Sequence, residues 1–364
     1  MAKELIVNAL VNFLGDYVEG FTKENIKVGI LSGKIILKGL GINREGIRRH
    51  LNLPINIVHG YVETLEVHVP WTNLDKERVQ IYINGVHLLV NPLNAATHTK
   101  ADAQQRVYLY RKYRLFQAEK SIKIAAQLTN ASDGMTHVSY FQNLVAKVVE
   151  NLDTKVTSIH IRFEDSSKHI AYGFFLESFS IVTTDSNWRE TFLTAEDLKG
   201  QTTPLPRYKL ASIRNLGVYW SNTAVMCGDI PFEEWLRFMK DISNPTVANN
   251  FLLHPPNDLS MQLSHITPNL HIHIHGTNLH FQLDKTQYRD IQQTSASLHH
   301  FQRMQRYLQY RPEQGPANDP RGWWRYALIL VTERERILQK KVCICLIWGS
   351  FVCLIWGCFC IYDR

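Results

Sequence analysis

The chain has 364 residues, 45% hydrophobic and 20% charged, which is typical of a folded protein and excludes low-complexity disorder. Its 40 Lys and Arg residues against 33 Asp and Glu give a formal net charge of +7, a mildly basic balance that suits anionic partners without choosing between phospholipid headgroups and nucleic acid. Five of the six cysteines lie between Cys343 and Cys360, so the body carries only Cys227 and cannot form an internal disulfide. This pattern indicates a reducing compartment, and we expect a cytoplasmic body.

The first predicted element is an amphipathic helix. Apolar residues recur at helical spacing from Leu5 to Val18, and Gly15 or Gly20 could end the helix. The apolar face must cover something, which leaves three interpretations: an ordinary core helix, a lid over the end of a groove, or a helix that touches a membrane.

Strand patterns with a period of two dominate the rest of the body. Each predicts a strand with one apolar face and one polar face turned to water, and they lie at residues 26–30, 65–69, 79–83, 159–163 and 270–274. A small or polar residue followed by an apolar-x-apolar step comes soon after several of them, at residues 38–42, 84–88, 177–181, 214–218 and 277–281. We interpret these as second strands, which makes a weak internal repeat of hairpins.

Two helical stretches interrupt the strands. Residues 101–128 mix basic and aromatic side chains, a composition that suits a solvated helix, base stacking or contact with anionic lipid. Residues 138–152 place apolar side chains on one face. A break rich in Pro and Gly at residues 311–316 precedes a last segment that contains Trp323 and Trp324, which suit a core or an interfacial anchor.

The one-sided strands need a partner for their apolar face. About twelve of them at ~4.8 Å spacing make a sheet about 60 Å long. Such a sheet closes into a sandwich or barrel, or stays open as a curved trough that something apolar fills. Periodicity alone favours the sandwich.

Six short motifs, in order along the chain, change that balance. Together they resemble the chorein domain, the N-terminal module of the vacuolar protein sorting-associated protein thirteen family of bridge-like lipid transfer proteins. The motifs are residues 13–18 (FLGDYV), 69–74 (VPWTNL), 158–165 (SIHIRFED), 183–185 with Trp188, Asn215-Leu216 with Tyr219-Trp220, and 323–327 (WWRYA).

This resemblance implies a mainly β fold with helices, of the β-rich α+β class. Its elongated, curved, mostly antiparallel sheet would form an open hydrophobic groove capped by the N-terminal helix. The groove would hold the acyl chains of glycerophospholipids and pass the lipids between organelle membranes at contact sites, one candidate being the endoplasmic reticulum. No catalytic residue, metal, cofactor or nucleic acid is expected, and the protein adaptors stay unknown.

The candidate groove residues are the apolar members of the predicted strands. They are Val28, Ile30, Ile35, Leu37, Leu65, Val67, Val69, Ile81, Ile83, Val86, Leu88, Ile159, Ile161, Phe163, Leu216, Val218, Ile272, Ile274, Leu279 and Phe281. For each of them the alternative is plain packing under a helix.

The chain divides into two expected parts. Residues 1–340 would be the lipid-transfer module with its first groove units, whereas residues 342–362 form an apolar tail without charges, long enough for a membrane helix. Within the tail, CLIWG at residues 345–349 recurs at 353–357, as in translated simple-sequence DNA, so the tail is either an anchor or a gene-model artefact. Family members continue well past the double tryptophan, so we expect a fragment or a shuttle rather than a bridge.

Two other functions compete with lipid transfer. His271, His273 and His275 share one strand face, and His280 could join them, which is the geometry of a zinc site in a metal-dependent hydrolase. The alternation equally suits a solvated face, and no HExxH, GxSxG or phosphate-loop motif is present. A nucleic-acid or scaffold protein is supported by charge alone.

Overall fold

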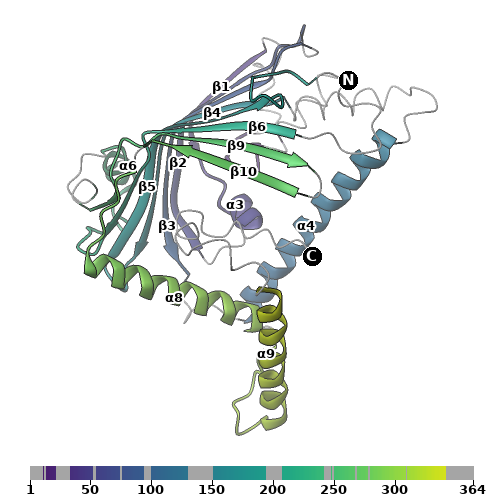
Figure 1. Cartoon of the computed structure of the whole chain (residues 1–364). Helices are drawn as coiled ribbons and strands as arrows, with labels where there is room; N and C mark the ends of the chain where they lie inside the picture. Colours follow the sequence, from purple (N-terminus) through teal and green to yellow (C-terminus); the bar gives the residue numbers. More distant parts are fainter. Residues whose placement is uncertain are drawn as a thin grey trace.

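The computed structural model describes residues 11, 14–21, 33–51, 55–73, 76–93, 100–129, 151–193, 207–241, 247, 250–266, 269–277, 279–308 and 310–341. Ten strands in this part form one open sheet (Figure 1). Their order is β1-β2-β3-β4-β5-β6-β9-β10, and β7 pairs with both β5 and β8. The expectation of a mainly β, open sheet is confirmed, whereas the closed sandwich or barrel that periodicity favours does not form.

β2 to β5 are the long strands, with 13 to 15 residues each, and the other strands have at most eight. They are β1 (Lys34–Gly41), β2 (Ile55–His68), β3 (Gln80–Pro92), β4 (Asp153–Asp165), β5 (Ile170–Thr184), β6 (Arg207–Arg214), β7 (Gly217–Ser221), β8 (Phe251–Leu253), β9 (Leu259–Ile266) and β10 (Asn269–Gly276).

All of the strand pairs are antiparallel except one. β3 and β4 run parallel, with Ile83 opposite Val156 and Val86 opposite Ile159. A parallel pair needs a long crossover, and residues 93–152, which include α4 (Lys100–Thr129), supply it. The expected antiparallel sheet is therefore right except at this pair.

Of the hairpins inferred from the second apolar steps, the one between residues 159–163 and 177–181 forms, as β4 and β5, whereas the one inferred within residues 79–88 does not. Residues 80–88 belong to one continuous strand, β3, and the small residue between the two steps is Gly85 with φ +70°. Gly39 in β1, Ser158 in β4 and Asn215 between β6 and β7 also have left-handed φ values, of +65°, +53° and +53°. The register aligns these residues across the sheet, with Glu63 and Glu177 between them on β2 and β5. We call Gly39, Glu63, Gly85, Ser158, Glu177 and Asn215 the left-handed row.

The two faces of the sheet pack against different segments. The inner face carries Leu65 and Ile81, which are buried with Leu14 and Phe21 of the N-terminal segment. The outer face carries His160, whose ring Nδ1 lies 2.8 Å from the main-chain oxygen of Met239 in α6 (Phe232–Lys240). α6 begins after Pro231, with acidic residues in its first turn and basic residues in its last turn, an arrangement that suits the helix dipole.

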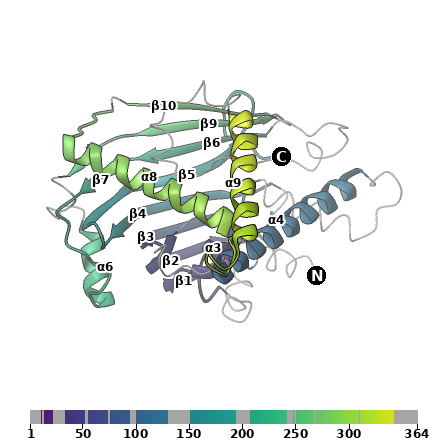
Figure 2. The ribbon, with the colours of Figure 1, turned by 90° about the horizontal axis from the view of Figure 1, so that it is seen from below.

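The other helices lie at the rim of the sheet or extend from it. α3 (Arg44–Leu51) follows β1, and α4 confirms the helix expected at 101–128. α8 (Lys285–Leu308) runs along the ends of the strands and α9 (Pro320–Lys341) extends away from it (Figures 1 and 2). The break expected before Trp323 is therefore confirmed. The expected helix at 138–152 lies outside the described residues apart from Asn151 and Leu152.

Within the described part of the chain, no helix has both the length and the apolar composition to span a membrane. Residues 342–362 lie outside the described residues, as does most of the helix expected near the N-terminus.

Candidate functional site: an apolar track on the inner face

Two apolar rows flank the left-handed row on the inner face. The row on the Leu65 side is paired strand by strand from β1 to β9, and side chains opposite one another in a sheet share a face. Its members are Leu37, Leu65, Ile83, Val156, Phe179, Ile213 and Leu259. The row on the Val62 side comprises Leu40, Val62, Val86, Ile159, Leu176 and Leu216. We call these two rows together the apolar track.

The track crosses the strands rather than following them. It passes over six strand spacings from β1 to β9, which is about 29 Å at the usual separation of neighbouring strands. Another apolar row adjoins it on each side. Ile35, Val67, Ile81 and Ile274 lie beyond the Leu65 row, and Leu88, Ile161 and Val218 lie beyond the Val62 row.

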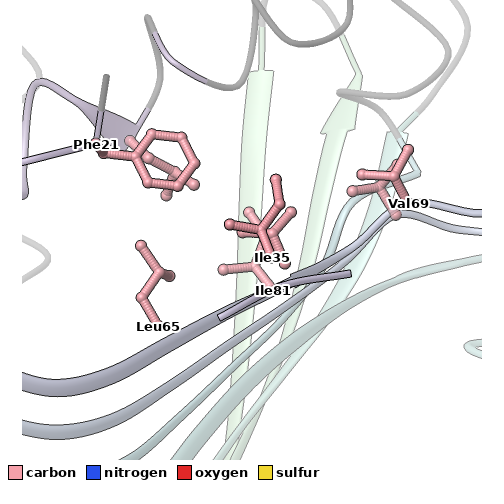
Figure 3. Close-up of a cluster of buried hydrophobic side chains, with 8 residues drawn as sticks. Phe21, Ile35, Leu65, Val69 and Ile81 are labelled. Atoms are coloured by element: carbon pink, nitrogen blue, oxygen red, sulfur yellow. The ribbon is translucent and has the colours of Figure 1, made fainter. Parts of the chain in front are cut away.

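One end of the inner face is covered by the chain itself. Ile35, Leu65, Val69 and Ile81 point to the same side of the strands, toward Phe21 (Figure 3). Leu65 is 0% exposed and Phe21 2%. The N-terminal segment therefore packs over the β1–β3 end, where these side chains belong to a core cluster.

The covering decreases toward the other edge of the sheet. Ile83, Val86, Ile159 and Ile161 are half-buried. On β10, Ile272 and Ile274 are 45% and 50% exposed. Exposed large apolar side chains with few neighbours are costly in water, so this end of the face is suited to an apolar partner.

An aromatic stack borders the track near α8. The rings of Phe163 and Tyr172 stack with centroids 5.1 Å apart, and Tyr172 and Trp220 stack at 4.4 Å. Gln287 of α8 donates a hydrogen bond from Nε2 to the Trp220 oxygen, at 3.0 Å. Burial raises the pKa of the Tyr172 hydroxyl to about 12, so this ring stays neutral.

The remaining candidates from the sequence lie around this track. Val69 is buried in the β1–β3 cluster, and Leu279 and Phe281 are exposed beyond β10, with Phe281 forming a bridge to Leu253. Val28 and Ile30 lie outside the described residues. The structure thus places most of the candidates on one face, at the β1–β3 end as core and toward β10 as open surface.

Sequence reasoning missed several members of the track. They are Leu40, Val62, Val156, Leu176, Phe179, Ile213 and Leu259. Val156 lies three positions before Ile159, and strict alternation would send it to the opposite face. The signal that could have found it is the small or polar residue that interrupts the two apolar runs.

The outer face is not solvated throughout, contrary to expectation. Under α6, Arg162 and Glu164 are both 0% exposed, and Arg162 Nε donates to Glu164 Oε1 at 2.7 Å. The Glu164 carboxylate also accepts from the Cys227 amide at 2.9 and 3.0 Å. Burial raises the pKa of the Cys227 thiol to about 12, which leaves this cysteine protonated and unreactive.

His160 belongs to the same buried network. Its Nε2 lies 2.9 Å from the Tyr219 hydroxyl, and its ring is 1% exposed. Burial lowers the pKa of His160 to about 4, so the ring is neutral near pH 7. The network is buried in the packing between the outer face and α6.

The geometry gives no support to a metal-dependent hydrolase. His271, His273 and His275 alternate with Ile272 and Ile274 on β10, so they lie on the outer face, and all three are exposed. No group of His, Cys, Asp and Glu side chains in the described part of the chain could hold a metal ion. A pocket of about 430 Å³ lies between β6, β9 and β10, and it is lined by Ser212, Ile213, Arg214, Asp258, Leu259, Ser260, His275, Gly276 and Thr277.

Comparisons with known proteins agree with the resemblance in the motifs. A model of the VPS13-like family N-terminal region matches residues 1–342. The intermembrane lipid transfer protein VPS13 of Chaetomium thermophilum is 30% identical over 92% of the chain and 11% of its own length. Vps13A of Dictyostelium discoideum is 26% identical over 91% of the chain, and human VPS13C 25% over 92%, each over 10% of its own length. The chain therefore spans about a tenth of the length of these relatives.

Proposed function

The chain belongs to the VPS13-like family, matched over its N-terminal region, and on that premise we propose that it holds the acyl chains of glycerophospholipids on the apolar track. It is then the N-terminal part of a non-enzymatic, bridge-like lipid transfer protein. The observation that carries the proposal is the track itself: a transverse apolar floor on an open sheet, covered at the β1–β3 end and exposed toward β10.

The physical argument rests on the cost of wetting acyl chains. Each CH₂ group moved from apolar surroundings into water costs about 0.8 kcal/mol. A lipid with two tails therefore crosses an aqueous gap too slowly unless its tails stay covered. A floor that runs across successive strands offers continuous apolar contact along its length. The headgroup needs no pocket, because it stays in water above the open face.

The relatives are named as intermembrane lipid transfer proteins, which supports membranes and lipids as partners. The proposal includes a cytoplasmic, peripheral position at contact sites between organelles, with the endoplasmic reticulum as one candidate membrane, and recruitment by adaptors of unknown identity. It needs no cofactor and no chemistry on the lipid. A role for residues 1–340 as the lipid-transfer module is part of the same proposal, which rests nothing on residues 342–362, an anchor or a gene-model artefact.

The test is mass spectrometry of lipids that co-purify with the full chain. We expect glycerophospholipids on the unmodified protein and less lipid on the double variant Ile83→Asp with Ile161→Asp, because both place a carboxylate on the inner face. A second pair of variants avoids the half-buried positions: Ile274→Asp on the exposed inner face of β10, against His273→Asp on its outer face.

Lipid loss in Ile274→Asp but not in His273→Asp would support the proposal. A folded, unmodified chain that carries no lipid, and takes up none from vesicles of phosphatidylcholine, would refute it. Equal loss in both β10 variants would show that the inner face is not the binding surface.

A further inference from the structure

The left-handed row reverses the side-chain alternation of the strands that it crosses. In a regular strand, residues three positions apart point to opposite faces. Leu176 and Phe179 nevertheless lie in the same apolar cluster, and so do Ile213 and Leu216. At the other end of the sheet, Leu37 and Leu40 pack against one common cluster.

Each of these pairs encloses one position of the left-handed row. Glu177 lies between Leu176 and Phe179, Asn215 between Ile213 and Leu216, and Gly39 between Leu37 and Leu40. Every neighbouring pair of strands from β1 to β5 contains at least one residue of this row with φ between +53° and +70°, and Asn215 continues the row directly after β6. The reversal therefore recurs from β1 to the segment between β6 and β7 and is not confined to one irregular strand.

We propose that Gly39, Gly85, Ser158 and Asn215 are the positioning residues of the lipid track. In β1, β3, β4 and the segment between β6 and β7, they turn the part of the chain on the Val62 side so that its apolar side chains face the same acyl chain as those on the Leu65 side. This inference rests on the proposed function, because it assigns to the row the task of making one lipid surface from two half-strands.

Local contacts hold the row in place. A Cβ added at Gly85 would lie 2.2 Å from Cγ of Glu63, and the Glu63 carboxylate pairs with Lys240 of α6. This position therefore excludes a side chain by space as well as by conformation. Gly39 differs, because among the described residues an added Cβ there would meet only the Tyr61 hydroxyl, at 3.8 Å.

The row is fixed differently near β9. The Asn215 amide donates to Asp258 Oδ1 at 2.9 Å, and the Leu216 amide donates to the Asn257 oxygen at 2.8 Å. Asn257 is buried and returns a bond from Nδ2 to the Leu216 oxygen, at 2.7 Å. Asparagine is one of the few residues besides glycine that adopts this backbone region readily.

The experiment uses a phosphatidylcholine with a photoactivatable acyl chain, crosslinked to the full chain, with labelled residues mapped by mass spectrometry. The variants are Ser158→Val and Asn215→Val, because a β-branched side chain disfavours the left-handed region. The matched controls are Ser158→Gly and Asn215→Gly, which keep that region accessible.

The quantity measured is the ratio of labelling on the Val62 side to labelling on the Leu65 side. For the Ser158 variants it compares Ile159 with Val156, and for the Asn215 variants it compares Leu216 with Ile213. We expect the valine variants to lower this ratio by about fivefold or more, and the glycine controls to keep it within about twofold. A general loss of stability lowers both sides together and leaves the ratio unchanged.

If the valine variants do not fold, the Gly39→Ala variant replaces them, because no described residue crowds the new methyl group. The ratio measured is then labelling at Leu40 over labelling at Leu37. Variants that fold and keep the wild-type ratio would overturn the inference while the proposed function stands. Absence of labelling on the unmodified chain would instead overturn the proposed function, and this inference with it.

Discussion

Replacing Glu164 by glutamine removes the carboxylate from the ion pair under α6 and leaves the Arg162 guanidinium without a counter-charge. Both side chains are 0% exposed, and the bond between them is 2.7 Å long. Breaking a fully buried pair by removing one partner costs about 3–5 kcal/mol, because the remaining charge cannot return to water. Two contacts persist, since Arg162 Nη2 still donates to the Val225 oxygen at 2.8 Å and the guanidinium lies 5.0 Å from the Phe238 ring centre. We therefore expect a loss of about 3 kcal/mol in the free energy of unfolding, at the lower end of that range.

Urea unfolding measures this loss, and hydrogen exchange of the α6 amides shows whether the helix that covers the pair opens first. The matched control is Glu66→Gln, which breaks the exposed pair between Lys34 and Glu66, whose side chains are 53% and 36% exposed. Such a pair contributes about 0–1 kcal/mol. The double variant Arg162→Met with Glu164→Gln should recover part of the loss, because no unpaired charge is left. If Glu164→Gln cost no more than Glu66→Gln, the argument from burial would be wrong.

Buried histidines, the glycines of the left-handed row and the β10 histidines each give a further test. Burial lowers the pKa of His87 and His160 to about 4 in the folded chain, below the unfolded value of about 6.5. Their contribution to stability is therefore complete above pH 6.5 and is lost as the pH falls toward 4, by about 2–3 kcal/mol each. Urea midpoints at pH 7, 5 and 4 measure this loss, and His87→Leu should make the stability depend less steeply on pH. Gly39→Ala should lower the free energy of unfolding by about 1 kcal/mol, and Gly85→Ala by at least about 1 kcal/mol more, because only the methyl group at residue 85 would clash with a side chain, that of Glu63. Equal melting temperatures of the two variants would contradict this. Alanine at all three β10 histidines should change neither the zinc content nor the stability of the purified chain, and stoichiometric zinc lost on substitution would revive the hydrolase.

The one-sided strands and the α4 helix were predictable from the sequence, because alternation and a long helical composition are local signals. The openness of the sheet was predicted only by the family resemblance, since periodicity alone favoured the sandwich. The continuity of the strands through the left-handed residues was not predictable. Asn84-Gly85 between two apolar runs is also the signature of a tight hairpin turn, and local sequence does not distinguish a chain that reverses at such a residue from one that continues through it with a positive φ. Only the register with β2 and β4 separates the two cases.

The buried outer face was missed for a different reason. Arg162 and Glu164 alternate with apolar neighbours as a solvated face would, and polar residues of this kind are rarely buried. They are buried because Trp235 and Met239 of α6 bring a second apolar layer onto that face. The spacing of these two residues was a usable signal, but nine helical residues between loops leave a weak pattern.

The parallel pairing of β3 with β4 affects how the chain emerges from the ribosome. β1, β2 and β3 form a meander of neighbouring strands that can assemble as soon as Pro92 has been synthesised. β4 joins only after residues 93–152 have followed, and closing so long a connection carries a larger entropic cost. Until β4 is available, the backbone groups along the edge of β3 are unpaired, and this edge can pair with an incorrect strand.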